Sequence, residues 1–290
     1  MTFVDIVVTN YFSGIYKRYF SVKLYLYRQK STLVGYMLPE ARQREIVEHV
    51  TENDGCSVEE LAAVMECSKA TIRRDLNALA DKQLIERSHG GAVPATSVGK
   101  EQTFRQREVQ NLEAKQAIAE RAVTEVHDNQ VVFFDAGSTT MQVAKQLPPN
   151  ETVMAVTNSP LQSMELDDKG VEVKLTGGSL RSPTYSLVGP SAERFMERMT
   201  FDLLFLGTNA INPTEGLMTP NEAEAKIKSL MIEKSNRVVL VSDHSKLHEQ
   251  SFISFADFSD LDVFITNKSV PQDLRERFDG GDVEVVETAV

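Results

Sequence analysis

One stretch of the chain decides how its first part folds: SKATIRRDLNAL, residues 68–79. Ile72, Leu76 and Leu79 recur at the i, i+4, i+7 spacing that places side chains on one face of a helix. Ser68 stands before them as a helix N-cap. The stretch therefore predicts a helix that buries an aliphatic stripe and turns its polar side chains outward.

The outward face of this predicted helix carries side chains that can read DNA. An arginine fork can engage guanine, an asparagine can pair with adenine, and a threonine methyl can contact the thymine methyl. Basic side chains at the flank and the positive end of the helix suit phosphates. The alternative is a solvated helix face that happens to be basic. The candidates for base contacts are Ala70, Thr71, Arg74 and Asn77, and those for phosphate contacts are Ser68, Lys69 and Arg73.

The preceding residues predict two further helices. An apolar stripe with helical spacing runs through residues 40–53, and Gly55 ends that helix. The run Ser57-Val58-Glu59-Glu60 is a capping box that starts a second, short helix. Two short helices joined by a tight turn are the signature of a helix-turn-helix.

A short strand and a hairpin tip follow the third helix. Residues 84–87 favour a strand, and residues 88–92 carry two glycines at the tip. Such a wing places Arg87 or His89 over the DNA backbone, although His89 can equally be an ordinary exposed loop residue. We therefore predict a winged helix-turn-helix domain over residues 37–93.

Composition sets limits on the rest of the interpretation. A chain of 290 residues with 41% apolar residues favours two domains, and it contains no apolar run long enough to span a membrane. Cys56 and Cys67 lack partners at metal-ligand spacing, so we expect buried thiols, no metal and no cofactor in a soluble cytoplasmic protein.

The net charge of −11 opposes nucleic-acid binding, but the basic side chains gather on the predicted reading helix. We interpret this as local basic chemistry on an acidic background, and hypothesise a high-salt cytoplasm.

Two segments stand apart from the predicted domains. Residues 1–36 hold six of the seven tyrosines and no sustained period, so we expect a non-native or disordered extension ahead of Met37. The alternative is a basic, aromatic segment that lies on a membrane surface. Residues 94–111 are polar, and we interpret them as a linker.

The remainder, residues 112–290, predicts a mostly parallel α/β domain. A helix over residues 112–127 leads into Val131-Val132-Phe133-Phe134, an apolar run suited to a strand buried on both faces. Helical stretches separate most of the later strands, and parallel strands place ligand groups at their carboxyl ends. The further strand-like runs are residues 152–156, 171–176, 201–207, 237–243 and 263–266.

The first of these carboxyl ends predicts an anion site. Asp135-Ala136-Gly137-Ser138-Thr139-Thr140 follows the first strand and leads into a helix. Backbone amides at the helix N-terminus and the hydroxyls of Ser138, Thr139 and Thr140 can together hold a phosphate. The alternative is a helix N-cap that binds no ligand.

The other strand ends are polar as well. They carry Thr157-Asn158-Ser159, Thr176-Gly177-Gly178, Gly207-Thr208-Asn209 and the run Asp243 to Lys246. Converging hydroxyls, glycines and one lysine suit a small polyhydroxylated anion. Lys246 can pair with its phosphate, and Asp135 or Asn158 can bind its hydroxyls.

The chain resembles the DeoR family of sugar-metabolism regulators. In the first domain the resemblance lies in Thr71-Ile72-Arg73-Arg74-Asp75-Leu76 and Gly90-Gly91-Ala92. In the second it lies in Asp-x-Gly-Ser-Thr-Thr from Asp135, Thr-Gly-Gly with Arg181, Phe-Leu-Gly ending at Gly207, Gly216-Leu217 and Asp243-x-Ser245-Lys246. Cys67 and Asn267 stand where the family often has valine and aspartate. The acidic composition adds a resemblance to haloarchaeal members that regulate glycerol and fructose metabolism.

The resemblance implies a repressor with a sensor domain similar to sugar-phosphate isomerases. Its partners would be double-stranded operator DNA and a phosphorylated sugar or polyol effector that releases it. Paired half-sites in operators imply a homodimer or homotetramer. The main alternative is a sugar-phosphate isomerase-like enzyme, because Asp135, Asp243 and Lys246 supply candidate acid–base groups. A metal or redox switch through the two cysteines is a weaker alternative.

Overall fold

The computed structural model describes residues 38–53, 55–82, 84–88, 90–94, 101–149 and 152–288. The chain divides into two compact units near residue 95. We call the described residues 38–94 the winged unit and residues 101–288 the α/β unit. The expected N-terminal extension, residues 1–36, lies outside the described residues.

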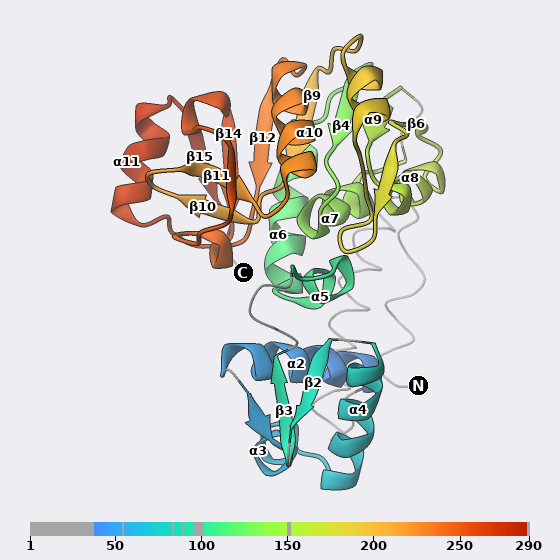
Figure 1. The fold of residues 1–290 in the computed structure, drawn as a ribbon, viewed down its shortest axis with the longest axis vertical. Coiled ribbons are helices and arrows are strands. Elements are labelled where there is room, and N and C mark those ends of the chain that lie inside the picture. The colour runs from blue at the N-terminus through green and yellow to red at the C-terminus, as the bar shows by residue number, and fades with distance from the viewer. Residues whose placement is uncertain are drawn as a thin grey trace, which may run out of the picture. The chain divides into compact units, whose positions relative to one another are not determined.

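The winged unit contains three helices and a small antiparallel sheet (Figure 1). The strands pair in the order β1-β3-β2, so that β2 and β3 form the wing. This confirms the predicted winged helix-turn-helix. The elements are α2 (Pro39–Glu52), β1 (Cys56–Ser57), α3 (Val58–Val64), α4 (Lys69–Asp81), β2 (Ile85–Ser88) and β3 (Gly91–Pro94).

Local capping chemistry sets the helix boundaries of the winged unit. The Ser57 side chain accepts a hydrogen bond from the Glu60 N–H, and Glu60 reaches back to the Ser57 N–H, which is the predicted capping box. Ser68 caps α4 by accepting from the Thr71 N–H at 3.1 Å. At Gly91 a Cβ would lie 2.1 Å from the Cys56 carbonyl oxygen, so only glycine lets β3 approach β1 this closely.

Aliphatic side chains from all three helices form the core of the winged unit. Ile46 and Val50 of α2, Leu61 of α3, and Ile72 and Leu76 of α4 are fully buried. These residues belong to the apolar stripes that the helical spacing of the sequence predicts. Cys56 is buried, whereas Cys67 is only half-buried, because it lies in the turn between α3 and α4.

The α/β unit is built on a seven-stranded parallel sheet, as predicted. Its order is β15-β14-β12-β9-β4-β5-β6, and in Figure 1 it runs from β15 beside α11 to β6 beside α8. The strands are β4 (Val131–Phe134), β5 (Met154–Thr157), β6 (Glu172–Leu175), β9 (Leu203–Leu206), β12 (Val238–Val241), β14 (Val263–Thr266) and β15 (Glu284–Glu287).

Helices cover both faces of this sheet. Alternate residues of each strand face opposite sides, so Phe133 packs in one buried cluster and Phe134 in the other. Helices α9, α10 and α11 contribute to the first cluster, and α6, α7 and α8 to the second. The helices are α6 (Leu112–Ala122), α7 (Ser138–Gln146), α8 (Pro160–Asp167), α9 (Pro190–Met196), α10 (Glu222–Glu233) and α11 (Gln272–Gly280).

The strand order reverses next to β4. The chain moves from β4 outward to β5 and β6, then returns to the other side of β4 and continues outward through β9, β12, β14 and β15. In open α/β sheets a crevice forms at such a switch point, outside the carboxyl ends of the strands. The fold therefore places a ligand crevice after β4 and β9.

Several elements differ from the sequence predictions. The helix expected over residues 112–127 ends at Ala122 and continues as one 3-10 turn, Val123–Glu125. Part of the predicted linker forms a capped helix, α5 (Phe104–Val109), because Thr103 and Gln106 make a capping box and Phe104 is buried. The chain also forms strands without a strong alternating pattern: β7 (Ser179–Arg181), β8 (Ser186–Val188), β10 (Ala210–Asn212), β11 (Gly216–Thr219) and β13 (Ile253–Ala256).

Candidate nucleic-acid interface and ligand pocket

Helix α4 turns its candidate DNA-reading side chains into solvent. Arg74 and Asn77 are exposed, whereas Ile72, Leu76 and Leu79 are buried on the opposite face. Lys69, Ala70 and Arg73 are also exposed, and Thr71 is half-buried. The six side chains thus form one accessible surface on the helix, which we call the α4 face.

A buried ion pair fixes the orientation of α4. Asp75 lies on the buried side of the helix, and its carboxylate accepts from Arg42 Nε at 2.6 Å and from Gln43 Nε2 at 3.2 Å. Both donors belong to α2. The sequence analysis missed this contact, because a charged residue within a basic helix gives no signal that it is buried.

Two members of the α4 face already have partners. Lys69 Nζ pairs with the Glu59 carboxylate of α3, and both side chains are more than half exposed. The Thr71 hydroxyl lies 2.9 Å from the Ser68 hydroxyl. Lys69 and Thr71 thus already have partners within the winged unit, whereas no hydrogen bond to a described residue occupies the guanidinium of Arg74.

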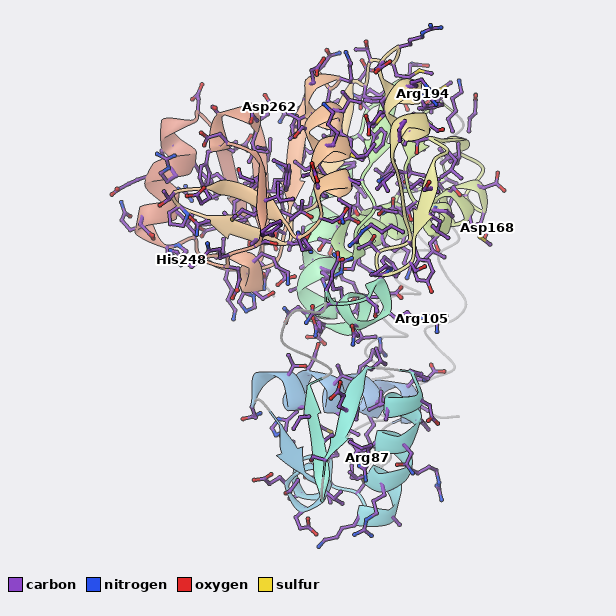
Figure 2. The ribbon with its side chains drawn as sticks, in the orientation of Figure 1. Arg87, Arg105, Asp168, Arg194, His248 and Asp262 are labelled. Carbon is purple, nitrogen blue, oxygen red and sulfur yellow. The ribbon has the colours of Figure 1, made fainter. Side chains whose placement is uncertain are left out.

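The wing presents one further basic side chain. Arg87 is exposed on β2, opposite Ala92 of β3 in the strand register, and is labelled in Figure 2. His89, the other wing candidate, lies outside the described residues.

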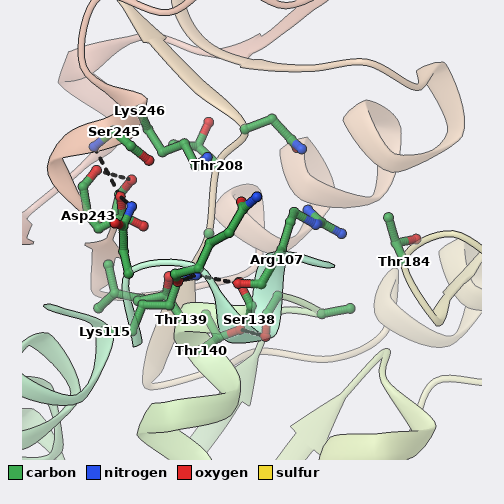
Figure 3. Close-up of a pocket in the computed structure, with 18 of the residues that line it drawn as sticks. Arg107, Lys115, Ser138, Thr139, Thr140, Thr184, Thr208, Asp243, Ser245 and Lys246 are labelled. Atoms are coloured by element: carbon green, nitrogen blue, oxygen red, sulfur yellow. Dashed lines mark hydrogen bonds between the residues drawn. The ribbon is translucent and has the colours of Figure 1, made fainter. Parts of the chain in front are cut away.

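The α/β unit holds a pocket at the switch point of its sheet (Figure 3). It opens where β4, β9 and β12 end, next to the N-terminus of α7 and beside α5, α6 and α10. The lining is mostly polar. It consists of Arg107, Gln110, Asn111, Lys115, Ala136, Gly137, Ser138, Thr139, Thr140, Thr184, Gly207, Thr208, Asn209, Glu224, Lys228, Val241, Ser242, Asp243, Ser245 and Lys246.

The N-terminus of α7 offers free donors to this pocket. Gly137 is its N-cap and provides no side-chain cap. The hydroxyls of Ser138 and Thr139 line the pocket and make no hydrogen bond to any described residue. Thr140 differs, because its hydroxyl donates to the Asp135 carbonyl oxygen at 2.6 Å. Ser138, Thr139 and the first amides of α7 therefore remain available to an anion.

Asp135 supports the structure beside the pocket and does not line it. Its carboxylate is fully buried, pairs with Lys228 Nζ and accepts from the Gly207 N–H at 3.0 Å. Burial raises the pKa of Asp135, while the Lys228 ammonium and the Gly207 N–H act in the opposite direction. Asp135 does not line the pocket, contrary to its predicted contact with a sugar hydroxyl. It instead ties the end of β4 to α10 and to the loop after β9.

The lysines around the pocket differ in whether their ammonium groups already have hydrogen-bond partners. Lys115 is buried and donates to the carbonyl oxygens of Arg107 and Gln110. Lys228 is held by Asp135 and by the Gly207 carbonyl oxygen at 2.9 Å. Lys246 is half-buried, and its ammonium has no hydrogen bond to a described residue, so it remains available to a ligand.

Asp243 and Glu224 are the acids of the pocket, and both are engaged. Burial acts to raise the pKa of Asp243, but the ammonium groups of Lys115 and Lys246 hold it below its ordinary value. The Asp243 carboxylate also accepts from Asn111 Nδ2 at 2.9 Å and from the Ser245 N–H at 3.0 Å. Neither acid is a free general base.

Glu224 is the centre of a hydrogen-bond cluster. Its Oε1 accepts from the Thr184 hydroxyl at 2.5 Å, the Ser186 hydroxyl at 2.7 Å and Arg181 Nη1 at 3.2 Å. Burial acts to raise the pKa of Glu224, yet these donors and the Lys228 ammonium hold it below its ordinary value.

The predicted effector-binding residues other than Asp135 fall into two groups. Gly137, Ser138, Thr139, Thr140, Gly207 and Lys246 line the pocket as expected, whereas Asn158, Gly177, Gly178 and Arg181 do not. Asn158 accepts from the Ala136 N–H and so supports the loop after β4. Arg181 pairs with Glu101 and Glu224, and at Gly178 a Cβ would lie 2.7 Å from the Val188 carbonyl oxygen. These residues shape the surroundings of the pocket.

Local sequence patterns do not identify Arg107, Lys115 and Lys228 as pocket residues. Arg107 lies in the predicted linker, and Lys228 lies on α10, 93 positions from Asp135. The one sequence signal for Lys115 and Lys228 as pocket residues is that each lysine falls on the buried face of an amphipathic helix. Among the described residues, no group of three or more His, Cys, Asp or Glu side chains is placed to hold a metal ion.

Family comparisons match both units. The DeoR C-terminal sensor domain matches residues 110–268, and the DeoR-like helix-turn-helix domain matches residues 42–98. The chain belongs to the DeoR family. No described helix is long and apolar enough to cross a membrane.

DeoR-family relatives match along most of their length. The HTH-type transcriptional regulator GlpR of Haloferax volcanii is 58% identical over 251 residues, which cover 87% of this chain and 98% of that protein. The HTH-type transcriptional regulator GolR of Listeria innocua is 32% identical over 243 residues, which cover 83% of this chain and 96% of that protein. The HTH-type transcriptional repressor CsqR of Escherichia coli is 30% identical over 246 residues, covering 84% and 94%.

The overlap with solved structures is weaker. A D-ribose-5-phosphate isomerase in complex with phospho-erythronic acid has a TM-score of 0.36 at 15% identity, covering 47% of this chain and 54% of its own. The full-length sorbitol operon regulator SorC from Klebsiella pneumoniae has a TM-score of 0.33 at 11% identity, covering 70% and 88%. Overlaps of this size carry no argument about activity.

Proposed function

We propose that this DeoR-family protein is a cytoplasmic repressor of sugar or polyol catabolism genes, released from its operator by a phosphorylated sugar or polyol. The observation that carries the proposal is that one chain combines two surfaces that present hydrogen-bond donors. The α4 face exposes Arg74 and Asn77, and the pocket offers the free donors of Ser138, Thr139 and Lys246. The relatives named as regulators and repressors support it.

On the DNA side, each exposed group has a proposed partner. Arg74 and Asn77 contact base edges in the major groove, with Ala70 and Thr71 beside them. Arg73, Lys69 and Ser68 contact phosphates, and Arg87 of the wing contacts the neighbouring backbone. Because operators of this kind consist of paired half-sites, the protein binds as a homodimer or homotetramer.

On the effector side, the pocket suits a small polyhydroxylated anion. The N-terminus of α7 carries a partial positive charge, and the amides and hydroxyls of Ser138 and Thr139 can donate to phosphate oxygens. Lys246 adds a full charge. Thr184, Thr208 and Asn209 line the same pocket and can bind sugar hydroxyls.

Ligand sensing fits this pocket better than turnover. Isomerisation needs a free base near the substrate carbon, whereas Asp135 is paired with Lys228, and Asp243 and Glu224 are engaged with neighbouring donors. We therefore propose that the protein is not an enzyme. Incubation with ribose, fructose and glycerol phosphates should yield no product.

The proposal is tested by operator binding and release. A duplex that the protein prefers is first selected from a random pool, and its binding is followed by fluorescence anisotropy. Adding ribose, fructose and glycerol phosphates one at a time should identify at least one that releases the duplex, while the unphosphorylated compounds do not. No preferred duplex, or no release by any phosphorylated compound, would contradict the proposal.

A further inference from the structure

Arg107 brings two guanidinium nitrogens to the pocket that no described residue bonds. Arg107 lies on α5 and lines the pocket, and its Nε and Nη2 are buried without a hydrogen-bond partner among the described residues. In Figure 3 its guanidinium points to the Thr184 side of the pocket, away from Lys246. Buried guanidinium donors without partners are costly, so this one calls for a physical explanation.

Nearby acids do not supply the missing partner. Glu101 and Glu224 lie close enough to act on the Arg107 guanidinium electrostatically, but their ion pairs are with Arg181. The second carboxylate oxygen of Glu101, Oε1, is also buried without a hydrogen-bond partner among the described residues, and it forms no ion pair with Arg107. Burial lowers the pKa of Arg107, and the carboxylates of Glu224 and Glu101 act to raise it. An arginine guanidinium keeps its charge in proteins, so Arg107 brings a buried cation with two unfilled donors to the wall of the pocket.

The backbone beneath this side chain is firmly held. The Phe104 N–H donates to the Pro183 carbonyl oxygen at 2.6 Å, and Glu108 pairs with Lys145 of α7 at 2.9 Å. Lys115 holds the Arg107 carbonyl oxygen itself. Because α5 is anchored at both ends, the donors of Arg107 are preorganised for a ligand and do not depend on its arrival.

We propose that Arg107 binds the anionic group of the effector through Nε and Nη2. The inference rests on the proposed function of the pocket as the effector site, and adds a binding residue outside the two family matches, which end at residue 98 and begin at residue 110. The two donors form a planar fork that matches two oxygens of a phosphate or a carboxylate. A neutral sugar cannot satisfy this fork.

Arg107 lies in the part of the sequence between the two matched domains. Residues 101–109 directly precede the first helix of the matched sensor region and follow the winged unit in the chain. A ligand held by Arg107 is bonded to this connecting segment as well as to α7. Removing the fork should therefore weaken both effector binding and release from DNA.

Calorimetric titration of the full chain tests this role. The variants are Arg107→Lys, which keeps the charge and loses the fork, and Arg107→Gln, which loses both. The matched control is Arg105→Lys, because Arg105 is exposed on the same helix and is labelled in Figure 2. The probes are fructose, ribose and glycerol phosphates, the unphosphorylated sugars, and gluconate as a sugar carboxylate.

We expect Arg107→Lys to lose at least about tenfold in affinity for the probe that the wild type binds, and Arg107→Gln more. Arg105→Lys should bind like the wild type, and all variants should bind operator DNA equally without effector. Without ligand, the unfolding temperature of Arg107→Gln should equal or exceed that of the wild type, because the substitution removes an unpaired buried charge. A lower temperature would instead indicate a structural role.

The possible outcomes separate this inference from the proposed function. Equal affinity of Arg107→Lys and wild type for a phosphorylated probe overturns the role of Arg107 and leaves the proposed function standing. Binding of gluconate alone, weakened in Arg107→Lys, supports the role of Arg107 and overturns the phosphorylated effector. If the wild type binds no anionic probe, both are overturned.

Discussion

Charged side chains are exposed to solvent on the α4 face, whereas those around the pocket are buried or half-buried. On the α4 face, Arg73 and Arg74 stand in solvent, where charges are screened and cost little to expose. Around the pocket, the Asp135–Lys228 ion pair is buried, and so is Glu224, which accepts from the Ser186 hydroxyl. The first arrangement suits a polyanion held by many weak, salt-dependent contacts. The second suits a small ligand, because a desolvated pocket rejects molecules that leave its donors unsatisfied.

The largest effect should come from the one buried ion pair beneath the α4 face. Asp75→Ala removes the carboxylate that pairs with the buried Arg42 guanidinium, which should cost about 3 to 5 kcal/mol of unfolding free energy. The matched control is Asp81→Ala, an exposed acid at the end of the same helix. Denaturant unfolding monitored by circular dichroism measures both. Equal stability of the two variants would show that Asp75 does not anchor α4.

Arg74 should show the largest effect on DNA binding. Arg74→Ala should weaken operator binding by about 1 to 3 kcal/mol and relax base preference, because a bidentate base contact is lost. Arg44→Ala, an exposed arginine of α2, serves as the control. Anisotropy titrations against selected and scrambled duplexes measure the effect. A loss of equal size on both duplexes would make Arg74 a phosphate contact.

Acid should destabilise the α/β unit through Glu224. Its pKa is depressed in the folded state, so its contribution to stability is present above the ordinary value of 4.5 and is lost as pH falls through the lower folded value. Unfolding free energy measured from pH 6 to pH 3 should therefore fall less steeply below 4.5 in Glu224→Gln. Glu222→Gln, exposed on the same helix, should keep the wild-type slope. Parallel curves for all three proteins would refute this role.

The smallest effect should distinguish the two flanking basic residues of α4. Arg73→Ala should reduce the slope of log affinity against log salt by about 1, since one phosphate contact disappears. Lys69→Ala should reduce it less, because Glu59 already holds Lys69. Anisotropy across a salt series measures both slopes. Equal reductions would indicate that the Glu59 pair does not survive DNA binding.

The winged unit could be predicted from sequence because local rules decide it. The Ser57 and Ser68 caps and the stripe through Ile72 depend on residues a few positions apart. Asp75 escaped prediction, since its partner Arg42 lies 33 positions away.

The pocket could be predicted only in part. The glycine and hydroxyl pattern after β4 located the edge of the pocket that we propose binds an anion, and the run of apolar strands predicted the sheet. Two features remained hidden: the Asp135–Lys228 pair joins segments distant in sequence, and Arg107 sits in a polar stretch with no period. The local Thr103–Gln106 capping box starts a helix in that stretch, and the tertiary contacts of Phe104 and Glu108 make this helix a wall of the pocket.

The most direct measurement is the ratio of affinities for a selected duplex and a scrambled duplex of the same length and composition. If the α4 face reads base edges, the selected duplex should bind at least on the order of 10³-fold more tightly at one fixed salt concentration. The Arg74→Ala variant should bring the ratio down. A ratio near one for the wild type would contradict a sequence-specific regulator.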